Sequence, residues 1–277
     1  MGKNSHIEWT HHTFNPWWGC AKVSPACQHC YAEAWAKRVG SRVWGTRAPR
    51  RFFGIDHWEE PVKWNAEAQK MGTRARVFCA SMADVFEDRR DLDAERTKLW
   101  NLIDATPSLD WLLLTKRPEK VSNLTRWGKS WPASVWLGTT IENQEWVDKR
   151  IPHLLASHAK IRFLSCEPLL GQIDLTTYVK KGTPTPIHWI IAGGESGSHS
   201  RPMDPEWVRN LRDFSRKNEI AFHFKQWGHW APSVPDEEPK AKTVRVGGKT
   251  TMVALGKGAA GRILDGQTYD ELPTVAA

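Results

Sequence analysis

Short apolar segments rich in β-forming residues recur along this chain, and their spacing limits the folds that it can adopt. They lie at residues 76–81, 111–115, 135–140, 161–166, 188–194 and 221–225. Successive segments start roughly 25 to 35 residues apart, with stretches of helical spacing between them. Near-continuous apolar strands separated by helices are typical of repeated strand–helix–strand units, in which a parallel sheet is covered on both faces.

Helix signals lie in several of the gaps. Asp204-Pro205 is an N-cap residue followed by a first-turn proline, and apolar residues mark one face of the segment that follows. Pro118 begins a second predicted helix, and the apolar residues between 147 and 155 mark a third. We also expect a first short strand over residues 10–14.

These patterns predict an α/β fold, a partial (βα)6-type TIM-like barrel over residues 1–230. The composition changes at Ala231: residues 232–242 are typical of an exposed loop, and residues 243–255 of a hairpin about a Gly-Gly turn. We therefore expect residues 231–277 to form a small loop-and-hairpin appendage.

Polar or glycine-rich clusters follow five of the predicted strands. They occupy residues 81–84, 115–117, 140–143, 165–167 and 193–195. In α/β barrels and open α/β sheets, ligands bind at the carboxyl ends of the strands. The five clusters are therefore expected to line one mouth, together with Glu167 and Arg201.

Three of the five cysteines, Cys20, Cys27 and Cys30, lie within eleven residues, in a loop over residues 17–31. Three thiolates can hold a [4Fe–4S] cluster and leave one iron open for an exogenous ligand. The spacing alone also allows incidental thiols or a structural zinc site. The histidines that would complete such a zinc site are His11, His12 and His29. The position of the loop, after the first strand of a barrel-like series, favours the cluster over zinc.

The charge balance suits an anionic partner. The chain has 39 Lys+Arg against 31 Asp+Glu, a net charge of +8 and a pI near 9.3, although many solvated surfaces are equally basic. Its seventeen tryptophans can stack on bases or pack in the core. The candidate phosphate contacts are Arg47, Arg50, Arg51 and the basic segment 240–249.

Residues 1–12 contain no secretory signal, and no apolar run approaches eighteen residues. An odd number of cysteines without such a signal argues against a disulfide framework. We expect a soluble, cytoplasmic protein with reduced thiols and no membrane partner.

The barrel pattern, the early three-cysteine loop, His29 before the third cysteine and Tyr31 after it resemble the radical S-adenosylmethionine superfamily. The usual spacing there is three then two residues, whereas here six residues separate Cys20 from Cys27. A wider set of segments resembles the phage-associated three-Cys-motif proteins. These segments are TFNPWWGC, LLTKRPE, VWLGTTIENQEW, RFLSCEPLLG, IIAGGESG and FKQWG.

A looser similarity is to the spore photoproduct lyase family, radical enzymes that repair a thymine dimer in DNA. That family has Ala-Ser-Cys-Thr-Ser-Asp, Thr-Lys and Ser-Ile-Asn strand ends in this order. Here the matching stretches are residues 80–84, Thr115-Lys116 and residues 140–143. Met82 stands where the family carries its hydrogen-donating cysteine, so this resemblance points to another donor. Cys166, at the end of a strand, is the better candidate, whereas Cys79 is expected in the core.

The resemblance implies a [4Fe–4S] cluster on the three loop cysteines and S-adenosylmethionine on its open iron. Reductive cleavage would give methionine and a 5′-deoxyadenosyl radical that abstracts hydrogen from a nucleobase in lesion-bearing or single-stranded DNA, or in RNA. A reductant protein such as flavodoxin or ferredoxin is implied as a partner. The implied cofactor-binding residues are His29, Tyr31, Ser81, Lys116, Thr140, Glu142, Asn143, Gly193, Gly194 and Glu195. The implied catalytic residues are Cys166, Met82 and Asp84.

Structural roles are open for the same residues. His29 and Tyr31 can simply pack in their loop, Lys116 can be a solvated lysine, and Asn143 can cap a helix. Glu195 and Arg201 can form structural ion pairs. Two other functions also stay open: a zinc- or cluster-bearing nucleic-acid-binding protein without catalysis, and a radical enzyme acting on a small metabolite.

Overall fold

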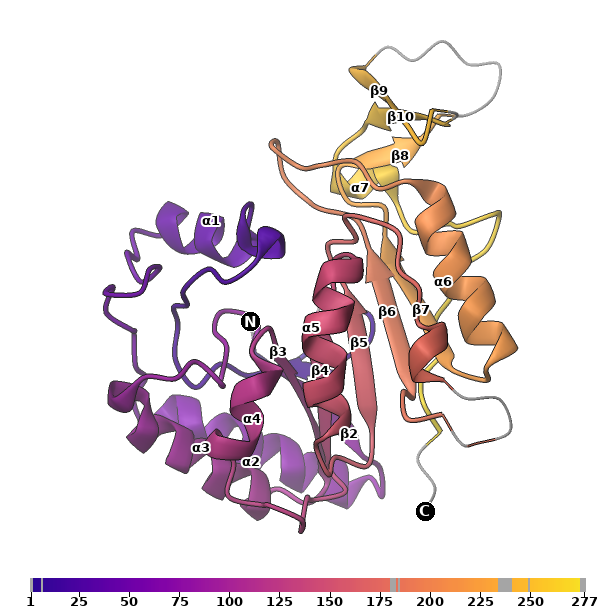
Figure 1. The fold of residues 1–277 in the computed structure, drawn as a ribbon. Coiled ribbons are helices and arrows are strands. Elements are labelled where there is room, and N and C mark those ends of the chain that lie inside the picture. Colours follow the sequence, from indigo (N-terminus) through magenta and orange to yellow (C-terminus); the bar gives the residue numbers. More distant parts are fainter. Residues whose placement is uncertain are drawn as a thin grey trace. The chain divides into compact units, whose positions relative to one another are not determined.

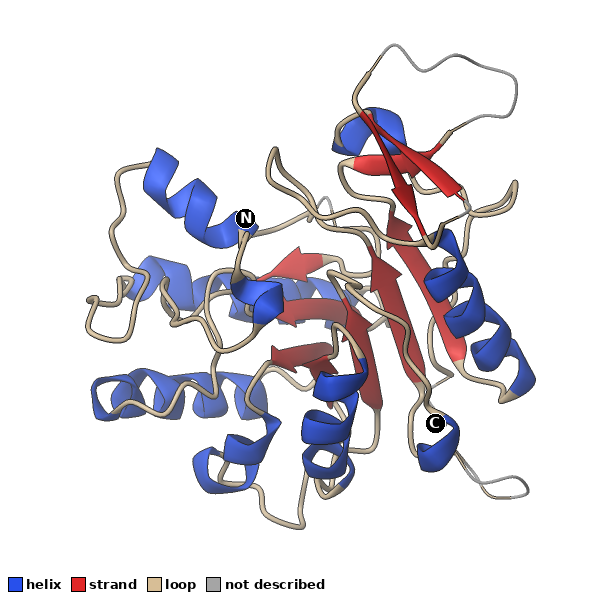
Figure 2. Ribbon diagram, turned by 45° about the horizontal axis from the view of Figure 1, so that its top comes forward, coloured by secondary structure: helices blue, strands red, loops and turns tan. Residues whose placement is uncertain are grey.

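The structure is a computed structural model that describes residues 2–5, 7–179, 183, 185–233, 241–248 and 250–274. The chain divides into two compact units that alternate along the sequence. The first unit comprises Met1–Ser24, Ala32–Thr139 and Arg150–Arg162. The second comprises Pro25–Tyr31, Thr140–Lys149 and Phe163–Ala277. Figures 1 and 2 show strands and helices following one another along the chain.

The first unit is built on parallel strands that pair in chain order. They are β1 (His12–Thr13), β2 (Ala75–Cys79), β3 (Leu109–Thr115) and β4 (Val135–Thr140), whose last residue belongs to the second unit. Val77 pairs with His12 on one side and with Trp111 on the other. The middle of β3 is fully buried, as expected for a strand covered on both faces.

Helices follow the strands of the first unit. They are α1 (Tyr31–Arg38), α2 (Ile55–Lys70), η2 (Arg90–Leu92), α3 (Asp93–Ala105), η3 (Pro118–Lys120) and α4 (Val121–Leu124). Helix α2 packs against α3, β2 and β3. The helix predicted from Pro118 is present but short, because a 3-10 turn is followed by four α-helical residues and Thr125 is already extended.

The second unit repeats the pattern with β5 (Arg162–Cys166), β6 (Trp189–Gly193) and β7 (Ala221–Gln226), which are also parallel. Its other elements are η1 (Pro25–Cys27), η4 (Thr176–Tyr178), α6 (Pro205–Lys217) and the start of α5 (Gln144–Leu155). Helix α6 lies along β6 and β7 (Figure 1). The Asp204 carboxylate accepts the Glu206 N–H at 3.0 Å, which confirms the predicted cap.

A small antiparallel sheet in the second unit contains β8 (Trp230–Pro232), β9 (Thr243–Val246) and β10 (Thr250–Ala254), and helix α7 (Lys257–Ala260) follows it. Strands β9 and β10 pair antiparallel, with Thr250 opposite Val246, and Gly247 and Gly248 in the turn between them have positive φ of 56° and 71°, which glycine adopts without strain. The predicted hairpin is therefore confirmed. Most of the loop predicted at 232–242 lies outside the described residues.

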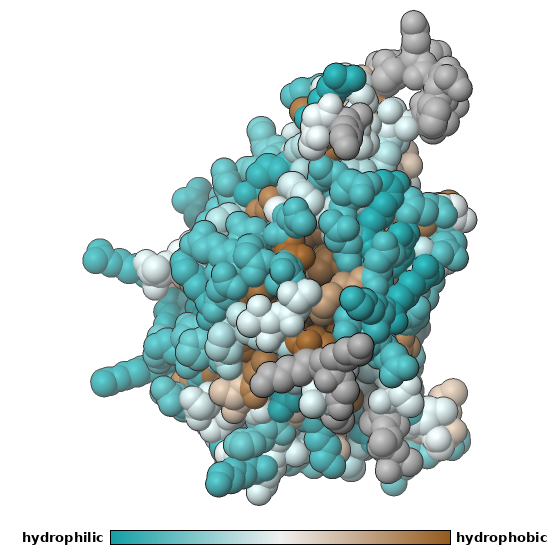
Figure 3. Space-filling view, turned by 45° about the vertical axis from the view of Figure 1, so that its right-hand side comes forward, coloured by the Kyte–Doolittle hydropathy of each residue, from teal (hydrophilic) through white to brown (hydrophobic). Residues whose placement is uncertain are grey.

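The observed elements confirm the predicted class, an α/β fold of the partial-barrel kind with parallel strands. The strand expected over residues 10–14 is present as β1. No helix among the described residues is long and apolar enough to cross a membrane. Hydrophilic residues cover most of the face shown in Figure 3.

Candidate functional site

A buried ion pair joins the carboxyl ends of β2 and β3 in the first unit. Arg117 Nη1 donates to Asp84 Oδ2 at 2.9 Å, and both side chains are less than a tenth exposed. The Thr115 hydroxyl donates to Asp84 Oδ1 at 2.8 Å, and the Lys116 N–H donates to Oδ2 at 3.0 Å. Burial alone would raise the pKa of Asp84, but Arg117 and these donors hold that pKa below its usual value. Asp84, a predicted catalytic residue, is thus fully engaged as a carboxylate.

Arg117 also contacts the cysteine loop. Its Nη1 lies 3.7 Å from Cys20 Sγ, and its Nη2 donates to the carbonyl oxygen of Ala21 at 2.8 Å. Burial raises the pKa of the Cys20 thiol to about 12, Asp84 adds to that rise, and the guanidinium opposes it by favouring the thiolate. Sequence reasoning identified the cluster at 115–117 but missed Arg117 as the residue that reaches the loop.

Asn15 organises the end of β2. Its Oδ1 accepts the Met82 N–H at 2.7 Å, and its Nδ2 donates to Ser81 Oγ at 3.0 Å. The Gly19 N–H donates to the Met82 carbonyl at 3.0 Å, so the backbone of Met82 holds the loop just before Cys20. The Met82 side chain is 1 % exposed. Asn15 was missed, although it belongs to the TFNPWWGC segment.

In the second unit, Glu195 ties the middle of the cysteine loop to the end of β6. His29 Nδ1 lies 3.1 Å from Glu195 Oε2, and Arg201 donates to the same oxygen through Nε at 2.9 Å. Arg201 also donates to the carbonyl of Pro25 at 3.0 Å. Burial would raise the pKa of Glu195, but the hydrogen bonds from Arg201 and His29 keep that pKa below its usual value. This geometry matches the structural alternative for Glu195 and Arg201.

Glu142 and Asn143 follow β4 and have different surroundings. Glu142 is fully buried, and its Oε1 accepts the Ala26 N–H at 3.2 Å, one residue before Cys27. Asn143 Oδ1 accepts the Trp146 N–H at 3.3 Å, which is the predicted helix-capping geometry. Thr140, just before this pair, is fully buried.

The Gly193-Gly194 pair is needed for close packing of the chain. A Cβ on Gly194 would lie 1.9 Å from the Trp227 carbonyl oxygen, and one on Gly193 would lie 2.8 Å from Glu167 Oε1. The same Glu167 oxygen lies 3.2 Å from Lys225 Nζ. Gly194 is therefore required by its contact with the backbone, independently of any ligand, whereas a Cβ on Gly193 would first meet the end of the flexible Glu167 side chain.

The five cysteines, all within the described ranges, fall into two groups, and none is in a disulfide. Cys20, Cys27 and Cys30 are partly exposed, whereas Cys79 and Cys166 are fully buried. Burial raises the pKa of both buried thiols. The Cys79 prediction is confirmed.

The loop cysteines belong to different units. Cys20 is in the first, while Cys27, the last residue of η1, and Cys30, just before α1, are in the second. Tyr31 begins α1 and is 57 % exposed. In the part of the chain that the structure describes, no three His, Cys, Asp or Glu side chains are grouped as a metal site. The ligand set is therefore an inference from the sequence.

Arg50 corrects one prediction. Its side chain is fully buried and forms two hydrogen bonds with Glu87, of 2.6 and 3.0 Å, besides donating to the Val43 carbonyl. It holds the loop after α1 and cannot also contact phosphates. Arg47 and Arg51 are exposed, as predicted for a phosphate contact. Within segment 240–249, Lys240 and Lys249 lie outside the described residues.

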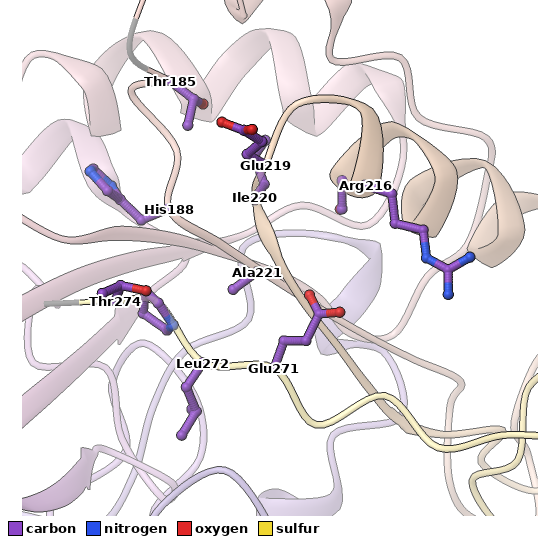
Figure 4. Close-up of a pocket in the computed structure, with 11 residues that line it drawn as sticks. Thr185, His188, Arg216, Glu219, Ile220, Ala221, Glu271, Leu272 and Thr274 are labelled. Atoms are coloured by element: carbon purple, nitrogen blue, oxygen red, sulfur yellow. The ribbon is translucent and has the colours of Figure 1, made fainter.

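A cavity of about 490 Å³ in the second unit lies away from the carboxyl ends of the strands (Figure 4). Glu219, Glu271 and Arg216 are among the side chains that line it. Ala221, the first residue of β7, also lines it, so this cavity is at the amino end of the strand. Ligands of α/β folds bind at the opposite ends of the strands, so the cavity is not a candidate active site.

The profile of one protein family, described as "Protein of unknown function (DUF5131)", matches residues 4–273. The chain belongs to this family. The match extends over the cysteine loop and every strand-end cluster of this DUF5131 chain. The comparison does not identify the phage-associated three-Cys-motif family.

No curated protein matches this DUF5131 chain. Among solved structures, a spore photoproduct lyase mutant with bound AdoMet and dinucleoside spore photoproduct is similar at 14 % identity and a TM-score of 0.48, over 92 % of this chain and 71 % of that chain. Spore photoproduct lyase complexed with dinucleoside spore photoproduct gives 14 % identity and a TM-score of 0.45 over the same shares. These values are too low to assign a function.

The buried Asp84–Arg117 pair gives a direct prediction for stability. Arg117→Met should lower the free energy of unfolding by about 3 to 5 kcal/mol, because the Asp84 carboxylate is then left buried without its partner. Arg126→Met is the matched control: Arg126 pairs with Asp104 on the surface and should cost no more than about 1 kcal/mol. Urea unfolding followed by circular dichroism measures both, and equal losses would contradict the prediction.

Proposed function

We propose that this chain is a radical S-adenosylmethionine enzyme that carries a [4Fe–4S] cluster on Cys20, Cys27 and Cys30 and acts on a nucleobase. One observation carries the proposal. Three partly exposed thiols lie in one loop directly after the first strand of a parallel α/β partial barrel, while the other two thiols are buried. Buried cysteines usually pack as small apolar residues, whereas accessible ones are available as ligands.

The donor set fits an iron–sulfur cluster. Thiolates are soft ligands that suit iron–sulfur clusters, and three of them leave one iron open for the amino and carboxylate groups of S-adenosylmethionine. Arg117, 3.7 Å from Cys20 Sγ, is placed to stabilise a thiolate there. Hydrogen bonds to ligand sulfurs are one of the features by which proteins tune such clusters.

The loop is held in place by side chains at several points. In the first unit, Arg117 binds the carbonyl next to Cys20. In the second unit, Glu142 binds the Ala26 N–H and Arg201 binds the Pro25 carbonyl, both close to Cys27. Fixing the backbone near Cys20 and Cys27 lowers the conformational entropy that binding a cluster would otherwise cost.

When bound, the cluster and S-adenosylmethionine together supply a radical that removes a hydrogen atom from the substrate. Lys116, next to Arg117 at the end of β3, supplies a counter-charge for the methionine carboxylate. Cys166 is the last residue of β5, at the carboxyl ends of the strands where ligands of α/β folds bind, and its thiol has a hydrogen atom to donate. Met82 has no thiol hydrogen. Cys166 therefore takes the role of hydrogen donor, which the strand-end pattern of the spore photoproduct lyase family gives to a cysteine at the position of Met82.

The proposal predicts the metal content. Protein reconstituted without oxygen should be brown and contain about four irons per chain, because three thiolates hold one [4Fe–4S] cluster. Cys27→Ala should lose this iron, and the control Cys79→Ala, in the core of β2, should keep it. Iron and sulfide analysis measures the metal content. Stoichiometric zinc in place of iron would contradict the proposed cluster and would favour the alternative of a nucleic-acid-binding protein without catalysis.

The role of Lys116 gives a kinetic prediction. The reduced protein should cleave S-adenosylmethionine to 5′-deoxyadenosine, measured by chromatography. Lys116→Ala should raise the S-adenosylmethionine concentration needed for half-maximal cleavage by roughly tenfold, about 1.4 kcal/mol, because the variant has no charge-assisted hydrogen bond to the carboxylate. Lys120→Ala removes a nearby lysine that pairs with Asp88 and serves as the control. A cluster-loaded protein that does not bind S-adenosylmethionine would contradict the catalytic proposal.

Nucleic acid is the proposed substrate class, and a reductant protein such as flavodoxin or ferredoxin the proposed electron source. The net charge of +8 supports an anionic partner, and Arg47 and Arg51 are exposed cations in one loop. Radical chemistry on a base requires that the base leave its stack, so single-stranded or lesion-bearing strands cost a few kcal/mol less to engage.

Binding to single-stranded DNA should therefore weaken steeply with salt, since bound phosphates release counterions. The double variant Arg47→Met/Arg51→Met should reduce the slope of log affinity against log salt by roughly 0.7 for each phosphate that the variant no longer neutralises. Arg126→Met, which removes a surface arginine paired with Asp104, is the control. Fluorescence anisotropy measures the slopes. If neither DNA nor RNA bound at low salt, a small metabolite would replace nucleic acid as the substrate class.

A further inference from the structure

A second cavity, of about 280 Å³, lies in the first unit beside β1 and the first half of α2. Its lining includes Phe14, Trp18, Phe53, His57, Glu60 and Trp64. Small-molecule pockets usually measure about 300 to 1,000 Å³, so this one suits a single small ring system.

Aromatic rings form much of the lining. His57 stacks on Phe14, with ring centroids 4.8 Å apart and planes 19° apart, and its ring centroid is 4.3 Å from that of Phe53. Trp18 meets Phe53 edge to face at 5.5 Å. A flat heteroaromatic ring such as a nucleobase gains stacking energy on such surfaces, whichever of the bases it is.

The lining also offers hydrogen-bonding groups that a purely apolar guest would not use. The polar residues Thr13 and Asn15 belong to the lining. Glu60 lines the same cavity and can accept from amino groups, while its negative charge disfavours an anionic guest.

A cation lies at the aromatic residues of this cavity. The Arg51 guanidinium carbon is 4.5 Å from the centroid of the Trp18 ring and 5.5 Å from that of Phe53. Arg51 itself is exposed. An exposed arginine beside aromatic rings is a typical arrangement for binding single-stranded nucleic acid, where the cation contacts the phosphate and the rings stack on a base.

We propose that this cavity binds one unstacked nucleobase of a single-stranded nucleic acid against its aromatic wall, with Arg51 on the adjacent phosphate. This inference rests on the nucleic-acid part of the proposed function. Asn15 lines the cavity and also holds Ser81 and Met82 at the end of β2. A base in the cavity is therefore linked through Asn15 to Ser81 and Met82, in the cluster at residues 81–84. This link fixes the position of the nucleic-acid strand relative to that cluster.

Two neighbouring phenylalanines provide a matched test. Phe53 lines the cavity, whereas Phe52 is 45 % exposed and does not. With a dye-labelled single-stranded oligonucleotide, Phe53→Ala should weaken binding roughly 5- to 100-fold because it removes a stacking ring, and Phe52→Ala less than twofold. An oligonucleotide containing 2-aminopurine should show quenched fluorescence with the wild type and recovery with Phe53→Ala.

The outcomes separate this inference from the function on which it rests. An abasic strand of the same length should bind the wild type and Phe53→Ala equally, because it keeps the phosphates and lacks the base. Equal losses for Phe52→Ala and Phe53→Ala, or none, in variants with wild-type melting temperatures would overturn the cavity as a base site while leaving nucleic-acid binding intact. A wild type that cleaves S-adenosylmethionine but binds no strand would overturn the nucleic-acid assignment, and this inference with it.

Discussion

The first unit depends on the buried pair of Asp84 and Arg117. One carboxylate accepts from the side chains or backbone of four residues, and one guanidinium links it to the cysteine loop. Removing two charges from water is costly unless nearly every lone pair and proton finds a partner, and here the partners come from strand ends and loop together. The pair therefore fixes the backbone of Cys20 relative to β2 and β3. Its second-unit counterpart is Glu195, which holds the segment around His29.

Much of the fold could be predicted from the sequence because hydrophobic patterning is a local signal. The six apolar runs all form strands, and most of their residues are buried, as expected for strands covered on both faces. The Asp204-Pro205 cap and the Gly247-Gly248 turn are also encoded by single residues with strong conformational preferences. The helix at Pro118 is shorter than its pattern suggests, because periodicity sets the face of a helix more firmly than its length.

The site was less predictable, since its contacts join residues far apart in the chain. Arg117 reaches a loop 97 residues away, and nothing in the Thr115-Lys116-Arg117 cluster says which of the two cations turns inward. Arg50 and Arg51 illustrate the same limit: the first is buried on Glu87 and the second lies over Trp18. Asn15 was missed because an asparagine before a proline is typical of an ordinary turn. The strand-end rule located these positions but could not distinguish ligand contacts from structural ones.

The alternation of the two units along the sequence has a consequence for how such a protein can be inherited. Each unit is assembled from three separate stretches, and one boundary falls between Cys20 and Cys27. Any contiguous stretch that contains all of one unit also contains part of the other, so recombination that moves one gene segment cannot transfer one unit alone. The cysteine loop cannot be transferred between proteins as a separate module, as a zinc finger can. The three thiols and the barrel elements around them must therefore be passed on together, as one indivisible coding unit.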